Sequence, residues 1–177
     1  LEKFNGMFTI IIYDSKLNQL FVANDRYGVK PLYYYQNESQ LIFVSEIKQF
    51  KPFNLKLTLN NNIISTFLTT YFIDYNEETF YNEIKRFPKS HYSILKLNKL
   101  TPINFNNYYK LSLITKNNSN CKEEFNYLFN DAVKLRMRSD VPIGFASSGG
   151  LDSSSILYKA YHQLKEQQQQ TIEQTIN

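Results

Sequence analysis

The residues best suited to chemistry form a Ser/Gly-rich stretch at positions 147–154, which reads Ser-Ser-Gly-Gly-Leu-Asp-Ser-Ser. Gly149 and Gly150 permit a backbone with positive φ and carry no Cβ atom that would block a close anion. The serine hydroxyls add hydrogen-bond donors, and the stretch has no lysine of the kind found in a Walker A loop. This composition predicts a loop that binds a departing pyrophosphate group rather than one that transfers a γ-phosphoryl group.

The segments that flank this stretch would have to position it. A short apolar run at Ile143–Ala146 predicts a strand, and the spacing over Asp152–Leu164 predicts a helix. Such a connection places backbone N–H groups beside the positive end of a helix dipole, where anions bind. An ordinary strand-to-helix turn would use the same residues, with glycines serving the backbone, serines capping the helix and Asp152 as a first-turn acid. Composition alone leaves both interpretations open.

The first part of the chain has the pattern of a sheet. The β-branched and aromatic runs Met7–Asp14 and Gln19–Ala23 predict one hairpin, and Leu32–Tyr35 with Leu41–Val44 predict a second. Four strands in so short a span predict one sheet layer, whose exposed strand edges would make the isolated polypeptide poorly soluble. The other elements expected here are a helix capped by Ser45 that ends near Pro52, a helix over Ile63–Leu68, and strands at Tyr92–Leu97 and Ile103–Tyr108.

A change of pattern separates the two ends of the chain. The Asn-rich stretch Lys116–Asn120 predicts a linker, and hence domains over residues 1–115 and 116–177. Asn120 and Glu123 have the spacing of a capping box. The helix that follows carries one apolar face, expected to pack on a core, made of Phe125, Leu128, Phe129, Ala132 and Val133. The glutamine run 167–170 predicts an extension or a frayed end of the last helix.

Composition excludes several classes of protein. The net charge of +4 comes from 20 basic and 16 acidic residues dispersed along the chain, which argues against nucleic-acid binding. A hydrophobic content of 42%, with 14 Tyr and 14 Phe, favours a folded chain. No apolar stretch approaches the ~18 residues that span a bilayer. The single cysteine, Cys121, cannot form an internal disulfide, which predicts a reducing compartment and a cytoplasmic location.

Several segments together resemble the glutamine-hydrolysing asparagine synthetases. In chain order they are Asn5–Phe8, Asn24–Tyr33, Ser45–Lys48, Thr79–Tyr92, and Ser139–Gly144 leading into Ser148–Ser154. The resemblance implies the second half of an α+β class II amidotransferase domain, Ntn-hydrolase-like, with antiparallel sheets and helices. It implies next the first strand-loop-helix of an α/β adenine-nucleotide hydrolase-like synthetase domain, an ATP pyrophosphatase. An upstream part and a downstream part of the enzyme are therefore expected outside this sequence.

The resemblance also implies a function. The complete enzyme would make asparagine from aspartate and ATP through β-aspartyl-AMP, with Mg²⁺ as cofactor, ammonia from glutamine, and AMP and pyrophosphate as products. Its partners would be these small molecules, without nucleic acid or membrane, and the complete protein could form a homodimer. The residues implied to hold ATP or pyrophosphate are Ser148, Gly149, Gly150, Ser153 and Ser154, with Asp152 serving the metal or the loop geometry and Ser147 near the nucleotide.

The sequence departs from that family in ways that limit the inference. The family's glutaminase nucleophile is an N-terminal cysteine, whereas this sequence starts at Leu1, so no catalytic residue is assigned and the polypeptide by itself is expected to be inactive. Ser147 stands where the family usually has an apolar residue. β-Lactam-forming and peptide-cyclising adenylating enzymes share this layout, and a non-enzymatic remnant is a third reading. Structural roles are expected for Asp25 and Arg26, and surface or packing roles for His91, His162 and Cys121.

Overall fold

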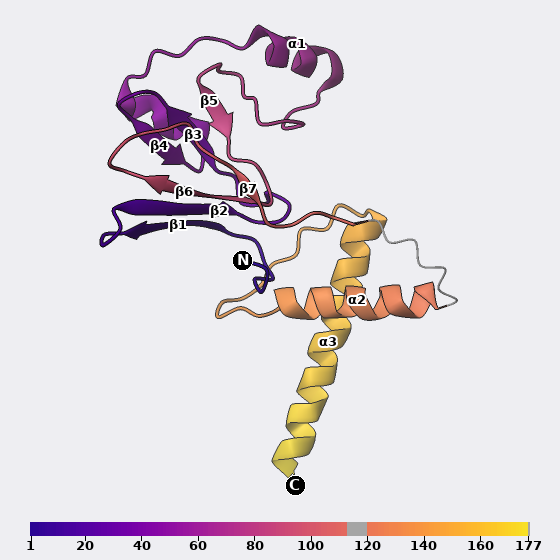
Figure 1. Cartoon of the computed structure of the whole chain (residues 1–177). Helices are drawn as coiled ribbons and strands as arrows, with labels where there is room; N and C mark the ends of the chain where they lie inside the picture. The colour runs from indigo at the N-terminus through magenta and orange to yellow at the C-terminus, as the bar shows by residue number, and fades with distance from the viewer. Residues whose placement is uncertain (113–119, 177) are drawn as a thin grey trace. The chain divides into compact units, whose positions relative to one another are not determined.

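The computed structural model describes residues 1–112 and 120–176, without the side chains of residues 167, 168 and 170–176. The chain divides into two compact units, residues 1–113 and 114–177 (Figure 1). In chain order the elements are β1 (Thr9–Asp14), β2 (Gln19–Asn24), β3 (Tyr33–Gln36), β4 (Leu41–Val44), the 3₁₀ helix η1 (Ile47–Phe53), α1 (Asn61–Thr70), β5 (Ile84–Arg86), β6 (His91–Lys96), β7 (Asn106–Asn107), α2 (Cys121–Arg136) and α3 (Leu151–Ile176).

The first unit contains two antiparallel sheets together with η1 and α1, and so has the α+β character expected from the sequence (Figure 1). One sheet has the order β1-β2-β6-β7, and the other has the order β4-β3-β5. Both predicted hairpins are confirmed, but the expectation of a single sheet layer is wrong. β2 takes β6 as its second neighbour and β3 takes β5, so each hairpin nucleates a separate sheet.

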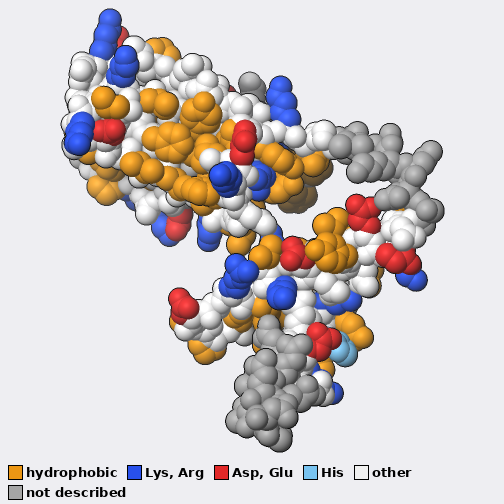
Figure 2. All heavy atoms as spheres, turned by 60° about the horizontal axis from the view of Figure 1, so that its bottom comes forward, with side chains coloured by type: hydrophobic (Ala, Val, Ile, Leu, Met, Phe, Trp, Pro, Cys, Tyr) orange, Lys and Arg blue, Asp and Glu red, His pale blue; other side chains and the backbone are white. Residues whose placement is uncertain are grey.

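The core of this unit lies between the sheets. Val22 and Leu95 come from the first sheet and are joined by Leu32 and Phe87, all of them buried. The strand register explains which residues of this sheet are buried. Val22 lies opposite Ser93, so their side chains are on the same face of the sheet, whereas the neighbours of Val22 in the chain have their side chains on the other face. The opposite face of the same sheet carries Ile10, Ile12, Phe21, Tyr92 and Ile94. The space-filling view shows apolar side chains gathered over a broad area of this unit (Figure 2).

The short helix after β4 differs from its prediction. Glu46, not Ser45, is its N-cap, and Gln49 Oε1 accepts the N–H groups of both residues at 3.0 Å. The helix ends at Phe53, one residue after Pro52, so its expected end is confirmed. Pro52 lies in the last turn, where a 3₁₀ helix loses little when one N–H is missing. The helix expected at Ile63–Leu68 is confirmed as α1, which is two residues longer at each end. Its N-cap is Asn60, whose side chain accepts from Ile63 N at 3.3 Å.

The two further strand predictions had different outcomes, and a third strand was not predicted. The strand expected at Tyr92–Leu97 is confirmed as β6, within one residue at each end. The strand expected at Ile103–Tyr108 shrinks to the two residues of β7, because Ile103 and Phe105 turn into the core instead of extending the ladder. β5 had no prediction, since three residues are too few to show an alternating pattern.

The second unit is built from α2 and α3, which pack against each other. The predicted capping box of α2 does not form, because Asn120 makes no side-chain cap bond there. The expected core packing of its apolar face is also wrong for Phe125 and Leu128, which are 68% and 56% exposed. α3 covers only the side of α2 that carries Val133, the buried residue of the helix. Residues 116–119 of the predicted linker lie outside the described part of the chain.

Candidate functional site

The Ser/Gly stretch forms a tight loop that runs directly into α3. The strand expected before it, Ile143–Ala146, is not formed, and this correction has a simple cause. A strand needs a neighbour, and none of the described residues pairs with this segment, so Ile143 and Phe145 stay 39% and 38% exposed. The helix expected at Asp152–Leu164 is confirmed, and it continues through the glutamine run, which is one of the two outcomes expected for that run.

The Ser153 hydroxyl makes the hydrogen bonds that close the loop. Its hydroxyl donates to the carbonyl of Gly150 at 3.2 Å and accepts the backbone N–H of Ser148 at 3.3 Å. The hydroxyls of Ser148 and Ser153 lie 3.2 Å apart, and Gly150 N–H donates to Ser148 Oγ at 3.4 Å. These bonds hold the two ends of the loop together before any ligand binds. The sequence suggested that the serines of this stretch bind a ligand or cap the helix, and it did not predict that Ser153 closes the loop.

The backbone of the loop adopts the positive φ for which glycine is needed. Gly149 has a φ of +77°, a region that L-residues rarely adopt. A Cβ atom on Gly150 would lie 3.3 Å from Ser148 Oγ. The first bond of the α3 ladder runs from Ser154 N–H to Gly150 O at 3.1 Å. The N–H groups of Leu151, Asp152 and Ser153 therefore lie in the first turn, where no carbonyl within the helix can accept them.

All of the predicted site residues occur on this one loop and the first turn of α3. Ser147, Ser148, Gly149, Gly150, Asp152 and Ser154 are exposed and Ser153 is half-buried. Asp152 is the acidic residue of the first turn. The exposure leaves the first-turn N–H groups of Leu151 and Asp152 and the Asp152 carboxylate open to a ligand from solvent.

An apolar cleft of about 830 Å³ borders this loop between α2 and α3. Phe125 and Phe129 stack in it with ring centroids 5.9 Å apart, and Asp152 and Ser154 belong to its lining. Lys159 lies in the same lining and donates to Asn126 Oδ1 at 2.9 Å. The sequence does contain a signal for the α3 side of this cleft. Its residues Asp152, Ser155, Ile156 and Lys159 have the spacing of one helix face.

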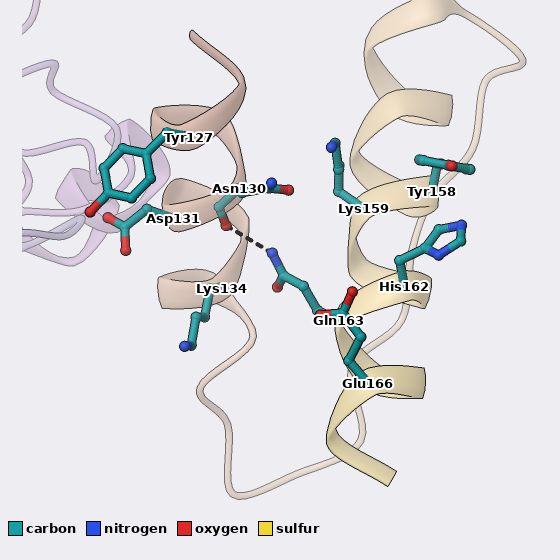
Figure 3. Close-up of a pocket in the computed structure, with 9 residues that line it drawn as sticks. All are labelled: Tyr127, Asn130, Asp131, Lys134, Tyr158, Lys159, His162, Gln163 and Glu166. Carbon is teal, nitrogen blue, oxygen red and sulfur yellow. Dashed lines mark hydrogen bonds between the residues drawn. The ribbon is translucent and has the colours of Figure 1, made fainter. Parts of the chain in front are cut away.

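A second, polar groove of about 580 Å³ lies between the same helices (Figure 3). Gln163 Nε2 donates to the carbonyl of Asn130 at 2.8 Å and so joins α3 to α2 (Figure 3). His162, expected to serve packing, lies 4.3 Å from Tyr158 between ring centroids. Among the described residues, no group of three His, Cys, Asp or Glu side chains has the geometry of a metal site.

In the first unit, Asp25 organises the loop that follows β2. Its Oδ1 accepts the N–H groups of Tyr27 and Val29, each at 3.0 Å, and its Oδ2 accepts those of Lys30 at 3.0 Å and Phe8 at 3.2 Å. Burial raises the pKa of the Asp25 carboxyl, but these four donors outweigh it and hold the pKa below its ordinary value. The predicted structural role of Asp25 is confirmed.

Two other residues with predicted roles have ordinary structural contacts. Arg26 donates to the carbonyl of Glu2 at 2.8 Å and lies over the ring of Tyr109, 5.2 Å from its centroid. His91 Nδ1 lies 2.7 Å from the carbonyl of Lys89. None of the helices in the described part of the chain is long and apolar enough to cross a membrane.

The chain thus combines an antiparallel α+β unit with a second unit in which a glycine-rich loop opens a helix. Comparison with known families identifies the class of protein to which these units belong. Residues 1–109 match the family described as glutamine amidotransferase domain, and residues 124–174 match the family described as asparagine synthase. The chain belongs to the glutamine amidotransferase domain family and is related to the glutamine-hydrolysing asparagine synthetases.

The relatives are much longer than this chain. The protein named "Putative asparagine synthetase [glutamine-hydrolyzing] 2" of Methanocaldococcus jannaschii is 35% identical over 89% of the chain and 31% of its own length. Asparagine synthetase [glutamine-hydrolyzing] 1 of Bacillus subtilis is 30% identical over 88% of the chain and 24% of its length. Amidase chry2 of Gibberella zeae is 28% identical over 94% of the chain and 25% of its length.

Proposed function

We propose that this chain is part of a glutamine-dependent asparagine synthetase of the cytoplasm, divided near residue 115 into part of an Ntn-hydrolase-like amidotransferase domain and the start of an ATP-pyrophosphatase domain. The loop Ser147–Ser154 is the observation that carries the proposal, supported by the match of residues 124–174 to the asparagine synthase family. The relatives' names supply the glutamine-hydrolysing reaction.

In the proposed reaction the loop binds the part of ATP that leaves. The β-carboxylate of aspartate attacks the α-phosphorus, a P–O bond forms, and the bond to pyrophosphate breaks. Ammonia then attacks the acyl carbon, so that a C–N bond forms and the C–O bond breaks, and asparagine, AMP and one proton are released. The N–H groups of Gly149, Leu151, Asp152 and Ser153 and the serine hydroxyls offset charge on the pyrophosphate. Ser147 would lie near the AMP part of the bound ATP.

The residues present also fit Mg²⁺. This ion usually binds one or two carboxylates together with substrate phosphates, and Asp152 supplies a carboxylate at the end of the loop that is proposed to hold those phosphates. When bound, Mg²⁺ would neutralise phosphate charge. Asp152 itself would hold the metal-phosphate group against the first turn of α3.

The path of one oxygen atom tests the reaction in the complete protein. With aspartate labelled by ¹⁸O in its β-carboxylate, each AMP should carry one labelled oxygen, because the attacking oxygen stays on phosphorus when the C–O bond breaks. The products should be asparagine, AMP and pyrophosphate in equal amounts, as measured by mass spectrometry. Formation of ADP and phosphate, or AMP without label, would contradict the proposal.

A second candidate function also begins with adenylation of a carboxylate, but the carboxylate is not that of aspartate. Two fungal relatives of similar identity are named amidases, chry2 and chyE, which favours an amide-forming enzyme with another carboxylate substrate, of the kind that β-lactam-forming or peptide-cyclising enzymes use. Labelled AMP with other carboxylates but not with aspartate would select this candidate. A polypeptide that fails to bind Mg²⁺-pyrophosphate would instead favour a non-enzymatic remnant.

The loop proposal makes a prediction for two glycines that differ in one property. A Cβ atom has open space at both Gly149 and Gly144, but only Gly149 has positive φ. Gly149→Ala should weaken Mg²⁺-pyrophosphate binding to the 177-residue chain about five- to thirtyfold, because the left-handed conformation costs an L-residue roughly 1–2 kcal/mol. Gly144→Ala should leave it unchanged. Titration calorimetry gives both values, and equal affinities would show that the loop backbone does not hold the anion.

A further inference from the structure

Three segments that are far apart in the sequence meet at the loop that follows β2. Ser90, which precedes β6, donates its N–H to the carbonyl of Asp25 at 2.9 Å and its hydroxyl to the carbonyl of Arg26 at 2.7 Å. Tyr108, which follows β7, donates its hydroxyl to the carbonyl of Asn24 at 2.7 Å. Its N–H donates to the carbonyl of Ser90 at 2.9 Å. These five residues form one hydrogen-bonded cluster, the Tyr108 junction.

The Tyr108 junction lies in the interior of the first unit. Asn24 and Asp25 are each 1% exposed, and Ser90 is 7% exposed. Buried carbonyl groups need donors from the protein, because water cannot reach them. Burial and the nearby Asp25 carboxylate raise the pKa of the Tyr108 hydroxyl, which therefore remains a donor throughout the neutral range. The junction thus depends on contacts inside this unit and not on its surface.

Ser90 has a backbone conformation that glycine would adopt at lower cost. Its φ is +63°, in the left-handed region that L-residues rarely adopt. A glycine at this position would avoid the steric cost but would lose the hydroxyl that donates to Arg26. Strained residues of this kind persist where the surrounding structure fixes them, and they are concentrated at functional sites. The strain at Ser90 therefore indicates that its hydrogen bond to the loop has a role beyond filling space.

The junction connects the start of β1 with the end of the first unit. On one side, the Asp25 carboxylate accepts the N–H of Phe8, the residue before β1, at 3.2 Å. On the other side, Tyr108 belongs to the segment that ends the first unit at residue 113. The next residue, Tyr109, has its ring centroid 5.2 Å from the guanidinium of Arg26. The start of β1 and the segment that leads toward the second unit are therefore held by the same loop.

We propose that Tyr108 and Ser90 are positioning residues that couple the two half-reactions of the complete enzyme. This inference rests on the proposed function, in which one domain hydrolyses glutamine to glutamate and ammonia and the other consumes the ammonia. Ammonia that does not reach the second reaction escapes into solvent, so tight coupling requires the chain to leave the first unit in a fixed position. Neither hydroxyl touches a substrate, and each acts through the loop of Asp25.

Hydrogen exchange in the 177-residue chain tests the link within the first unit. Tyr108→Phe keeps the ring but removes the donor to the buried carbonyl of Asn24. At least about fivefold faster exchange is expected for the four amides that donate to the Asp25 carboxylate, because they open with the loop. These are the amides of Phe8, Tyr27, Val29 and Lys30.

Tyr13→Phe is the matched control for that measurement. It also removes one tyrosine hydroxyl from the first unit, but this hydroxyl donates to Asn18 Oδ1 at 3.2 Å, in the exposed β1–β2 hairpin. The four amides should exchange at the wild-type rate in this variant. Wild-type exchange in Tyr108→Phe, or equal acceleration in Tyr13→Phe, would overturn the link between Tyr108 and the loop.

The ratio of glutamate to amide product tests the coupling in the complete protein. Tyr108→Phe and Ser90→Gly should each raise this ratio at least about twofold, the smaller end of what a coupling residue contributes. With saturating ammonia in place of glutamine, both variants should make the amide at about the wild-type rate. Ser90→Gly also relieves the backbone strain, so a raised ratio in this variant would not come from unfolding.

The outcomes distinguish this inference from the proposed function. A residue with only a structural role would lower glutamine-dependent and ammonia-dependent synthesis in parallel, which would overturn the inference, as would a wild-type ratio in both variants. Tyr13→Phe should keep the wild-type ratio. A wild-type enzyme that makes an amide other than asparagine would change the proposed substrate but still report the ratio. A wild-type enzyme that makes no amide would overturn both.

Discussion

Replacing Asp25 with asparagine will destabilise the first unit by about 3 kcal/mol, because two buried N–H groups would lose their acceptor. Each carboxylate oxygen of Asp25 accepts two backbone N–H groups, and the residue is 1% exposed. An asparagine has one oxygen, so its amide group must face two donors in either orientation. Hydrogen exchange of the sheet amides in urea measures the loss for this unit alone.

Asp14 provides the matched control. It also accepts two backbone N–H groups, those of Lys16 and Leu17, but both go to Oδ1. Asp14→Asn keeps that oxygen, so it should change the free energy of unfolding by less than about 0.5 kcal/mol. If Asp25→Asn cost no more than Asp14→Asn, the second carboxylate oxygen would have no part in holding the loop.

The Asp25 effect should also depend on pH. Because the folded-state pKa of Asp25 lies below its unfolded value, its contribution to stability is full above the unfolded value, about pH 4, and is lost as the pH falls through the folded pKa. The difference between wild type and Asp25→Asn should therefore be constant near neutrality and shrink in acid. A difference that grows on acidification would mean that the folded pKa is raised instead.

Replacing Phe87 with alanine will cost the same unit about 3–5 kcal/mol, the usual range for truncating a fully buried phenylalanine. Phe87 has no exposed surface, and its ring lies 5.2 Å from Phe105 and 6.4 Å from Phe43 between centroids. It joins residues of both sheets in one cluster with Val22 and Leu95. Its loss would leave a cavity between the two layers.

Two variants make that measurement specific. Phe87→Leu retains most of the volume and should cost about 1.5 kcal/mol. Phe53→Ala removes a ring that is 47% exposed at the end of η1 and should cost less than about 1 kcal/mol. All three are followed by urea denaturation with hydrogen exchange. Similar losses for Phe87→Ala and Phe53→Ala would contradict a core between the sheets.

The amino-acid sequence alone was sufficient for the local features of this protein. Alternating apolar residues and polar turns determined both hairpins, because strand and turn preferences act over a few neighbouring residues. The string Ser148–Ser154 determined the loop at the helix start, since glycine is required wherever φ is positive. The same motifs identified the family, which the matches over residues 1–109 and 124–174 confirm. The assignment of the loop residues to pyrophosphate remains a prediction.

Only the tertiary structure decided which segments become neighbours. β2 lies beside β6, with Phe21 opposite Ile94, and nothing local in either strand encodes that pairing. The hairpins consequently belong to two sheets instead of one, with Phe87 between them. The same reason explains the missing strand at Ile143–Ala146 and the exposed rings of α2. An apolar pattern shows that a segment can be buried, but burial requires a partner surface, and long-range packing alone supplies it.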